Sequence, residues 1–143
     1  MIIGTFDEDT HRPYIHCDVY LPRLNAWGEI SFLLDTGADR SLITSGDAHK
    51  LMIPYVELIG NSEMAGIGGT IHCFSERAIL GFRDRTKRLF VYDIMIDITD
   101  DGPYTDEIPS LLGRDVIDRW CIVYDPQKGI LNATVRSSDI YEP

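Results

Sequence analysis

Apolar and polar side chains alternate along the chain in short runs, a pattern typical of β-strands. In residues 14–21, every odd position is apolar and every even position is polar or aromatic. This period of two predicts a strand with one buried face. Further strands are predicted at residues 2–6, 28–34, 73–80, 89–96, 121–124 and 130–135, the last two joined by a turn at 125–129. Many short strands separated by turn residues favour a mostly β domain of the barrel or sandwich type.

Two short helices interrupt this pattern. Thr44 and Asp47 stand three residues apart, as in a capping box at a helix start, and Pro54 ends the predicted helix. A second short helix is predicted at residues 114–120, after an acidic loop at residues 97–109.

Length and composition predict one globular domain. The chain has 143 residues, of which 44% are hydrophobic, and no boundary signal divides it, so residues 1–143 are expected to form one domain. The polar tail at 136–143 is compatible with a loose end or with a terminal strand in an oligomer. The net charge of −10 argues against a nucleic-acid partner. No apolar run approaches the roughly 20 residues that span a bilayer, so no membrane partner is expected.

The cysteines and histidines indicate no disulfide framework and no metal site. The number of cysteines is odd, and no two of Cys17, Cys73 and Cys121 are closely spaced. Cys17 and Cys121 are expected to be small core residues. Reduced thiols and an N-terminus without an export pattern favour the cytoplasm. The four histidines (His11, His16, His49 and His72) are expected to face solvent, and no cofactor is predicted.

The most informative stretch is residues 32–39, where an apolar run ends at the carboxylate of Asp35. A carboxylate at the end of a buried strand is costly unless it is paired or used. Thr36 and Gly37 then turn the chain. The chain contains one such Asp-Thr-Gly triplet, so chemistry that needs two of these carboxylates requires a second copy of the chain.

Three pieces of sequence together resemble the retropepsin-like aspartic proteases, which include the retroviral proteases and their cellular and bacterial relatives. They are Leu-Asp-Thr-Gly-Ala-Asp at 34–39, Ala-Gly-Ile-Gly-Gly-Thr at 65–70 and Leu-Leu-Gly-Arg-Asp at 111–115. The resemblance extends from residue 2 to about residue 135. It implies a single-domain retropepsin-like acid-protease barrel with one or two short helices and an active site at a two-fold homodimer interface. The chain length and the acidic loop look more like cellular or bacterial members.

The resemblance implies an aspartic endopeptidase that cleaves a peptide or protein substrate. Asp35 from each of two copies would share one proton, because two carboxylates so close cannot both ionise. The ionised carboxylate would activate a water, and the protonated one would supply a proton to the leaving nitrogen. Thr36 and Gly37 would hold the carboxylate in place. Such a dyad is expected to work best on the acid side of neutrality.

The resemblance also implies a substrate-binding flap and floor. The segment at 63–71 would be a glycine-bearing hairpin that closes over an extended peptide. The implied flap and floor residues are Ala38, Asp39, Arg40, Gly66, Ile67, Gly68 and Gly69. Arg114 would pair with Asp39 and brace the floor as structural support.

Other functions remain open at this point. A catalytically silent dimer with the retropepsin fold would act as a peptide-binding or protein-binding module. The Asp35 triplet is also compatible with an ordinary turn in a β-domain, since Asp and Gly are common turn residues. A metal-dependent hydrolase ranks last, because the sequence lacks a His-rich ligand set.

Overall fold

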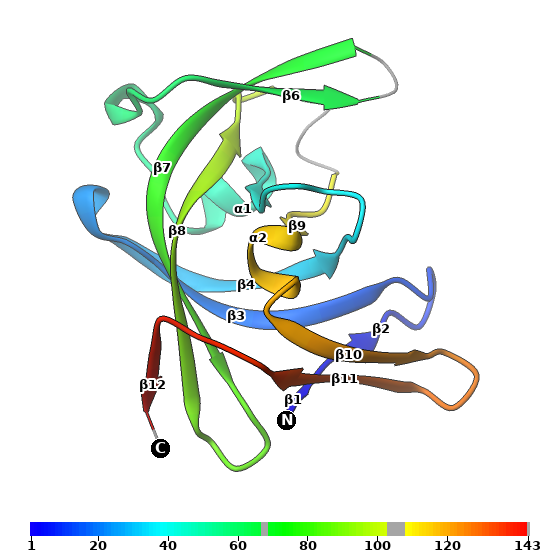
Figure 1. Ribbon diagram of the computed structural model, residues 1–143. Helices are drawn as coiled ribbons and strands as arrows, with labels where there is room; N and C mark the ends of the chain where they lie inside the picture. The colour runs from blue at the N-terminus through cyan, green and yellow to red at the C-terminus, as the bar shows by residue number, and fades with distance from the viewer. Residues whose placement is uncertain (67–68, 103–107, 143) are drawn as a thin grey trace.

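The computed structural model describes residues 1–66, 69–102 and 108–142 (Figure 1). The strands are β1 (Ile2–Ile3), β2 (Thr5–Phe6), β3 (Pro13–Leu21), β4 (Ala26–Leu34), β5 (Leu42–Ile43), β6 (Ser62–Gly66), β7 (Gly69–Arg83), β8 (Leu89–Thr99), β9 (Leu111–Leu112), β10 (Trp120–Asp125), β11 (Ile130–Val135) and β12 (Ile140–Glu142). The α-helices are α1 (Ser45–Lys50) and α2 (Arg114–Ile117), and the 3₁₀ turns are η1 (Pro22–Leu24) and η2 (Tyr55–Glu57).

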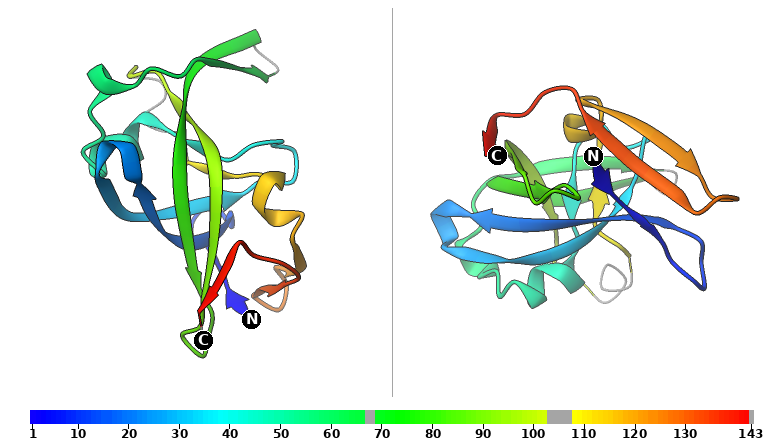
Figure 2. Two further views of the ribbon diagram at one scale, coloured as in Figure 1. Left: turned by 60° about the vertical axis from the view of Figure 1, so that its left-hand side comes forward. Right: turned by 90° about the horizontal axis from the view of Figure 1, so that it is seen from below.

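The main sheet closes into a barrel. Its strand order is β12-β8-β5-β9-β4-β3-β7-β6, and β7 also pairs with β8, which joins the two sides of the sheet. A small sheet with the order β1-β11-β10 lies beside the barrel (Figure 2). The predicted mostly β barrel with one or two short helices is therefore confirmed. Among the described residues, no helix has the length and apolar character needed to cross a membrane.

The predicted alternation sets the inner face of the barrel. In β3 the odd positions from Ile15 to Leu21 are buried, and the even positions from His16 onward are exposed. Phe32, Phe82 and Tyr92 fill the core from other strands. The hairpin of β10 and β11 is present as predicted.

Strand β7 is much longer than predicted, because one strand serves both the barrel and the hairpin that precedes it. Its first residues pair with β6, and the rest pairs with β8 and β3. Residues 69–72 are all exposed, so they show no alternation of buried and exposed positions although their backbone pairs with β6. The sequence pattern therefore did not reveal this part of the strand. In Figures 1 and 2, β6 and the start of β7 project from one end of the barrel, and Met1 and β12 lie at the other end.

Non-local pairing places the ends of two distant strands side by side. Strands β4 and β9 run parallel, with Leu33 opposite Leu111 and Leu34 opposite Leu112. The segment that follows β4 therefore lies next to the start of α2, although more than 70 residues separate them in sequence.

Several local expectations were wrong. Helix α1 does follow Thr44, but no capping box forms: the Thr44 hydroxyl donates to the Ile108 carbonyl at 2.7 Å, and Asp47 accepts from the Ser110 hydroxyl at 2.6 Å. Both side chains therefore form hydrogen bonds with residues distant in sequence and do not cap the helix. Cys121 is exposed rather than in the core.

Some element boundaries and the structure of the tail also differ from the expectation. Helix α2 ends at Ile117, earlier than predicted. The predicted acidic loop begins later, because residues 97–99 belong to β8; residues 103–107 of that loop lie outside the described residues. The tail forms β12, which pairs with residues 89–91 of β8 in the same chain.

Candidate active site

Asp35 lies directly after β4 at the start of a tight turn. Its backbone N–H donates to the Leu112 carbonyl of β9 at 3.0 Å, and its carbonyl accepts from the Ala38 N–H at 3.2 Å. The half-buried carboxylate accepts a hydrogen bond from the Gly37 N–H at 2.9 Å, its only such contact among the described residues. Thr36 and Gly37 are exposed at the tip of the turn. The fold therefore holds Asp35 rigidly at the backbone and leaves its carboxylate accessible.

The residues after the triplet are each bound to a different partner. Asp39 accepts a hydrogen bond from the Arg114 guanidinium, the ion pair that the family resemblance implied. Arg40 pairs with the buried Asp97 carboxylate at 3.0 Å. We call residues 35–41 the active-site loop. Ion pairs at Asp39 and Arg40 hold the second half of this loop in place.

Asp115 is a site residue that the sequence reasoning missed. Its carboxylate accepts from the Ser41 N–H at 2.9 Å and from the Ser41 hydroxyl at 2.7 Å. The Ser41 hydroxyl oxygen in turn accepts from the Gly113 N–H at 3.0 Å. Asp115 is the acidic residue of the Gly-Arg-Asp motif at 113–115, in which the family resemblance implies a role for the arginine.

Removing Arg114 is expected to destabilise the protein by more than the roughly 0.5 kcal/mol of an ordinary surface change. The reason is that the Arg114 side chain pairs with Asp39 and so holds the active-site loop against the start of α2. Urea unfolding of Arg114→Ala, Asp39→Ala and the double variant measures the coupling. Additive effects of the two single substitutions would show that the pair does not brace the loop.

The predicted flap is a hairpin of β6 and β7. Gly66 pairs with Gly69, whose φ angle of +117° is one that residues with a Cβ rarely adopt. Ile67 and Gly68, two of the implied flap residues, lie outside the described residues. The structure therefore describes the two strands of the flap and not the contact that its tip would make.

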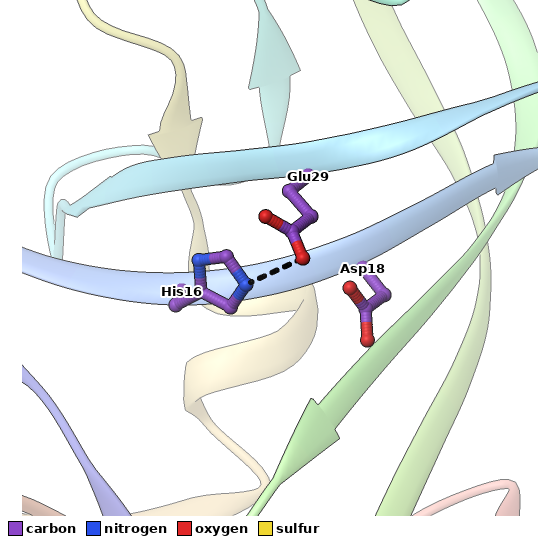
Figure 3. A group of neighbouring side chains, drawn as sticks. All are labelled: His16, Asp18 and Glu29. Atoms are coloured by element: carbon purple, nitrogen blue, oxygen red, sulfur yellow. Dashed lines mark ion pairs between the residues drawn. The ribbon is translucent and has the colours of Figure 1, made fainter.

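One group of side chains has the composition of a metal-ligand set. Figure 3 shows His16 and Asp18 of β3 beside Glu29 of β4. Their potential ligand atoms all lie within 4.8 Å of one another. All three are exposed, and His16 already pairs with Glu29 at 3.7 Å. They stand in the middle of their strands, whereas Asp35 follows the end of β4. Among the described residues, this cluster therefore offers no metal site beside Asp35.

The geometry agrees with the result of a comparison with known families. Residues 9–123 match the sequence model of the family described as retroviral aspartyl protease, a span that includes Asp35 and Arg114. The chain belongs to the retroviral aspartyl protease family. This confirms the resemblance drawn from the three sequence pieces.

Solved structures of this family share the fold. A retropepsin-like aspartic protease from Rickettsia conorii has a TM-score of 0.60 and 20% sequence identity, with 92% of this chain and 97% of that chain covered. The protease of EIAV, complexed with the inhibitor HBY-793, has a TM-score of 0.50 and 20% identity over 78% of this chain and 90% of that one. A comparison with curated proteins gave no match. At this level of identity, the neighbours establish the retropepsin fold for this chain.

Proposed function

We propose that this retropepsin-like protein is an aspartic endopeptidase that acts as a homodimer. The observation that carries the proposal is the Asp35 carboxylate, held at the end of β4 in the family's fold with one hydrogen bond from Gly37 and accessible to a further partner. The chain supplies one such carboxylate, and amide hydrolysis by an activated water, without a metal or covalent intermediate, requires both a base and an acid. Asp35 of the partner subunit would supply the second.

The reaction follows from the shared proton. The ionised Asp35 accepts a proton from a water, which attacks the carbonyl carbon of the scissile peptide bond. The protonated Asp35 of the other subunit donates a hydrogen bond to the carbonyl oxygen and then supplies the proton that the leaving nitrogen needs. The reaction starts from the singly protonated pair and regenerates it with the two roles exchanged, and no metal or covalent intermediate enters. The substrate is a peptide or an unfolded protein segment that fits beneath the β6–β7 hairpin in an extended conformation.

The open edge of β10 is the surface that we expect the two subunits to share. In the small sheet β10 is the last strand and pairs with β11 alone among the described strands. It carries no lysine or proline, the residues that commonly protect an edge, and Val123 and Tyr124 are about half exposed. An unprotected, apolar edge is a template for pairing with another strand.

The backbone of β10 has hydrogen-bonding groups directed to this edge. Just before β10, the Arg119 carbonyl accepts from the Arg136 N–H, so it faces the β11 side. Because backbone direction alternates along a strand, Ile122 and Tyr124 present their N–H and C=O groups to the open side. Two copies related by a two-fold axis would pair these edges into one antiparallel sheet of six strands.

A charge placed on this edge should dissociate the dimer. We expect Val123→Lys to shift the protein to monomer and to lower its specific activity most strongly at low concentration, since the lysine must be desolvated at the interface. Val56→Lys is the matched control, because Val56 is almost fully exposed on η2. Sedimentation and activity are measured over the same dilution series. Equal dimer content in both variants would place the interface elsewhere.

The direct test of the activity compares the wild type with Asp35→Asn on an unfolded protein substrate. Cleavage by the wild type alone supports the endopeptidase. If the wild type binds the same peptide without cleaving it, the protein is a binding module with the retropepsin fold.

A further inference from the structure

Asp97 is a buried charged residue between the active-site loop and the flap. It lies on β8 with an exposed fraction of 2%, and Ser75 of β7 and Leu42 of β5 are its strand partners. A buried carboxylate needs partners that offset its lost hydration.

Two side chains from different elements bind the Asp97 carboxylate. One oxygen pairs with the Arg40 guanidinium of the active-site loop at 3.0 Å. The other accepts from the hydroxyl of Ser62, the first residue of β6, at 2.9 Å. The Asp97 backbone N–H also donates to the Ser41 carbonyl at 3.1 Å. One residue therefore fastens the root of the flap to the loop that carries Asp35.

We propose that Asp97 is a positioning residue that fixes the flap root relative to the active-site loop through Ser62 and Arg40. The proposal rests on the proposed peptidase function. A flap root fixed in this way limits where the β6–β7 hairpin can close, so that a bound peptide lies in register with Asp35. If the link is lost, the hairpin samples more open positions and holds substrate less often.

The electrostatic cost of Asp97 argues against a role in stability alone. Burial raises its pKa, whereas the hydrogen bond from Ser62 and the charge of Arg40 lower it; the nearby Asp115 carboxylate raises it. Buried ion pairs can often be replaced by apolar residues without loss of stability. Because the ionised form of Asp97 is costly in this buried position, we infer that its contribution is the connection between the flap root and the active-site loop.

The Ser62 hydroxyl is the part of this link that can be removed with least disturbance. Ser62→Ala breaks the bond to the flap root and keeps the Arg40–Asp97 pair, and Ser62→Thr retains a hydroxyl. Ser75→Ala is the matched control. Ser75 is also half-buried, and it lies opposite Asp97 on the adjacent strand β7. Its side chain makes no hydrogen bond among the described residues.

We expect Ser62→Ala to lower kcat/KM by roughly ten-fold, mainly through a higher KM, because the flap binds the substrate more than it takes part in the chemistry. Ser62→Thr should restore most of the loss, and Ser75→Ala should match the wild type. In the free protein, amide hydrogen exchange over β6 should be faster in Ser62→Ala and unchanged in Ser75→Ala.

The exchange measurement needs no activity, so the two proposals can fail separately. If exchange over β6 and the KM of Ser62→Ala both equal those of the wild type, Asp97 does not position the flap, whether or not the protein is a peptidase. If exchange increases as expected and Asp35→Asn retains full cleavage, the link exists and the proposed chemistry is wrong.

Discussion

Asp35→Asn should abolish peptide cleavage and leave the fold almost unchanged. General acid–base groups contribute roughly 10²- to 10⁴-fold to a rate, and this single substitution removes both such groups of a homodimer. The amide oxygen of asparagine can still accept the hydrogen bond from the Gly37 N–H. Removing one carboxylate from each subunit also relieves the repulsion between them. Stability should therefore stay within about 0.5 kcal/mol of the wild type.

The measurement pairs initial rates on an unfolded protein with urea unfolding. Asp18→Asn is the matched control, since Asp18 is an exposed carboxylate on β3 outside the active-site loop, and it should keep the wild-type rate. Turnover by Asp35→Asn close to the wild-type rate would refute the catalytic assignment. A large loss of stability would indicate that Asp35 is a structural turn residue.

Gly113→Ala should be the most destabilising of the single substitutions considered. A Cβ at residue 113 would lie 2.6 Å from the Arg40 carbonyl carbon, 2.7 Å from its oxygen and 2.9 Å from the Ala38 carbonyl oxygen. All three atoms belong to the backbone of the active-site loop, so no side-chain rotation can relieve the contact. The added methyl group must push the loop away from α2, with a cost of about 2 kcal/mol or more.

Urea unfolding of Gly113→Ala measures this cost. Gly81→Ala is the control, because the nearest atom to its new Cβ is the flexible end of Leu89 at 3.2 Å, which can move. The displaced loop should also lower the peptidase rate of any protein that remains folded. A Gly113→Ala variant as stable and active as Gly81→Ala would mean that the close approach of the two segments is unimportant.

The alternation of apolar and polar residues correctly predicted the elements that depend only on neighbouring residues. The alternation in β3 and the turn between β10 and β11 depend on neighbouring residues, and both elements form as expected. The apolar run also placed Asp35 at the end of a strand. Its catalytic role came from the family resemblance, since an acid followed by Thr and Gly is also an ordinary turn. The ion pair between Arg114 and Asp39 came from the same source.

The remaining features depend on contacts between distant segments. The parallel pairing of β4 with β9 brings Gly113 against Arg40, which no periodicity in either segment indicates. Asp97 was assigned to an acidic loop, because its charge resembles that of the residues after it and its partners Arg40 and Ser62 are far away in sequence. Thr44 and Asp47 had the spacing of a capping box, but distant partners took both side chains.

Subunit mixing shows whether one active site contains Asp35 from two chains. A fixed amount of wild-type protein is incubated with increasing amounts of Asp35→Asn, and the remaining cleavage rate is measured. Activity should fall as wild-type chains enter mixed dimers, each of which has only one Asp35 carboxylate. Asp35→Asn that also carries Val123→Lys should inhibit far less, because it cannot pair. A cleavage rate that stays constant at a large excess of Asp35→Asn, in a sample where mixed dimers are detected, would contradict the shared site.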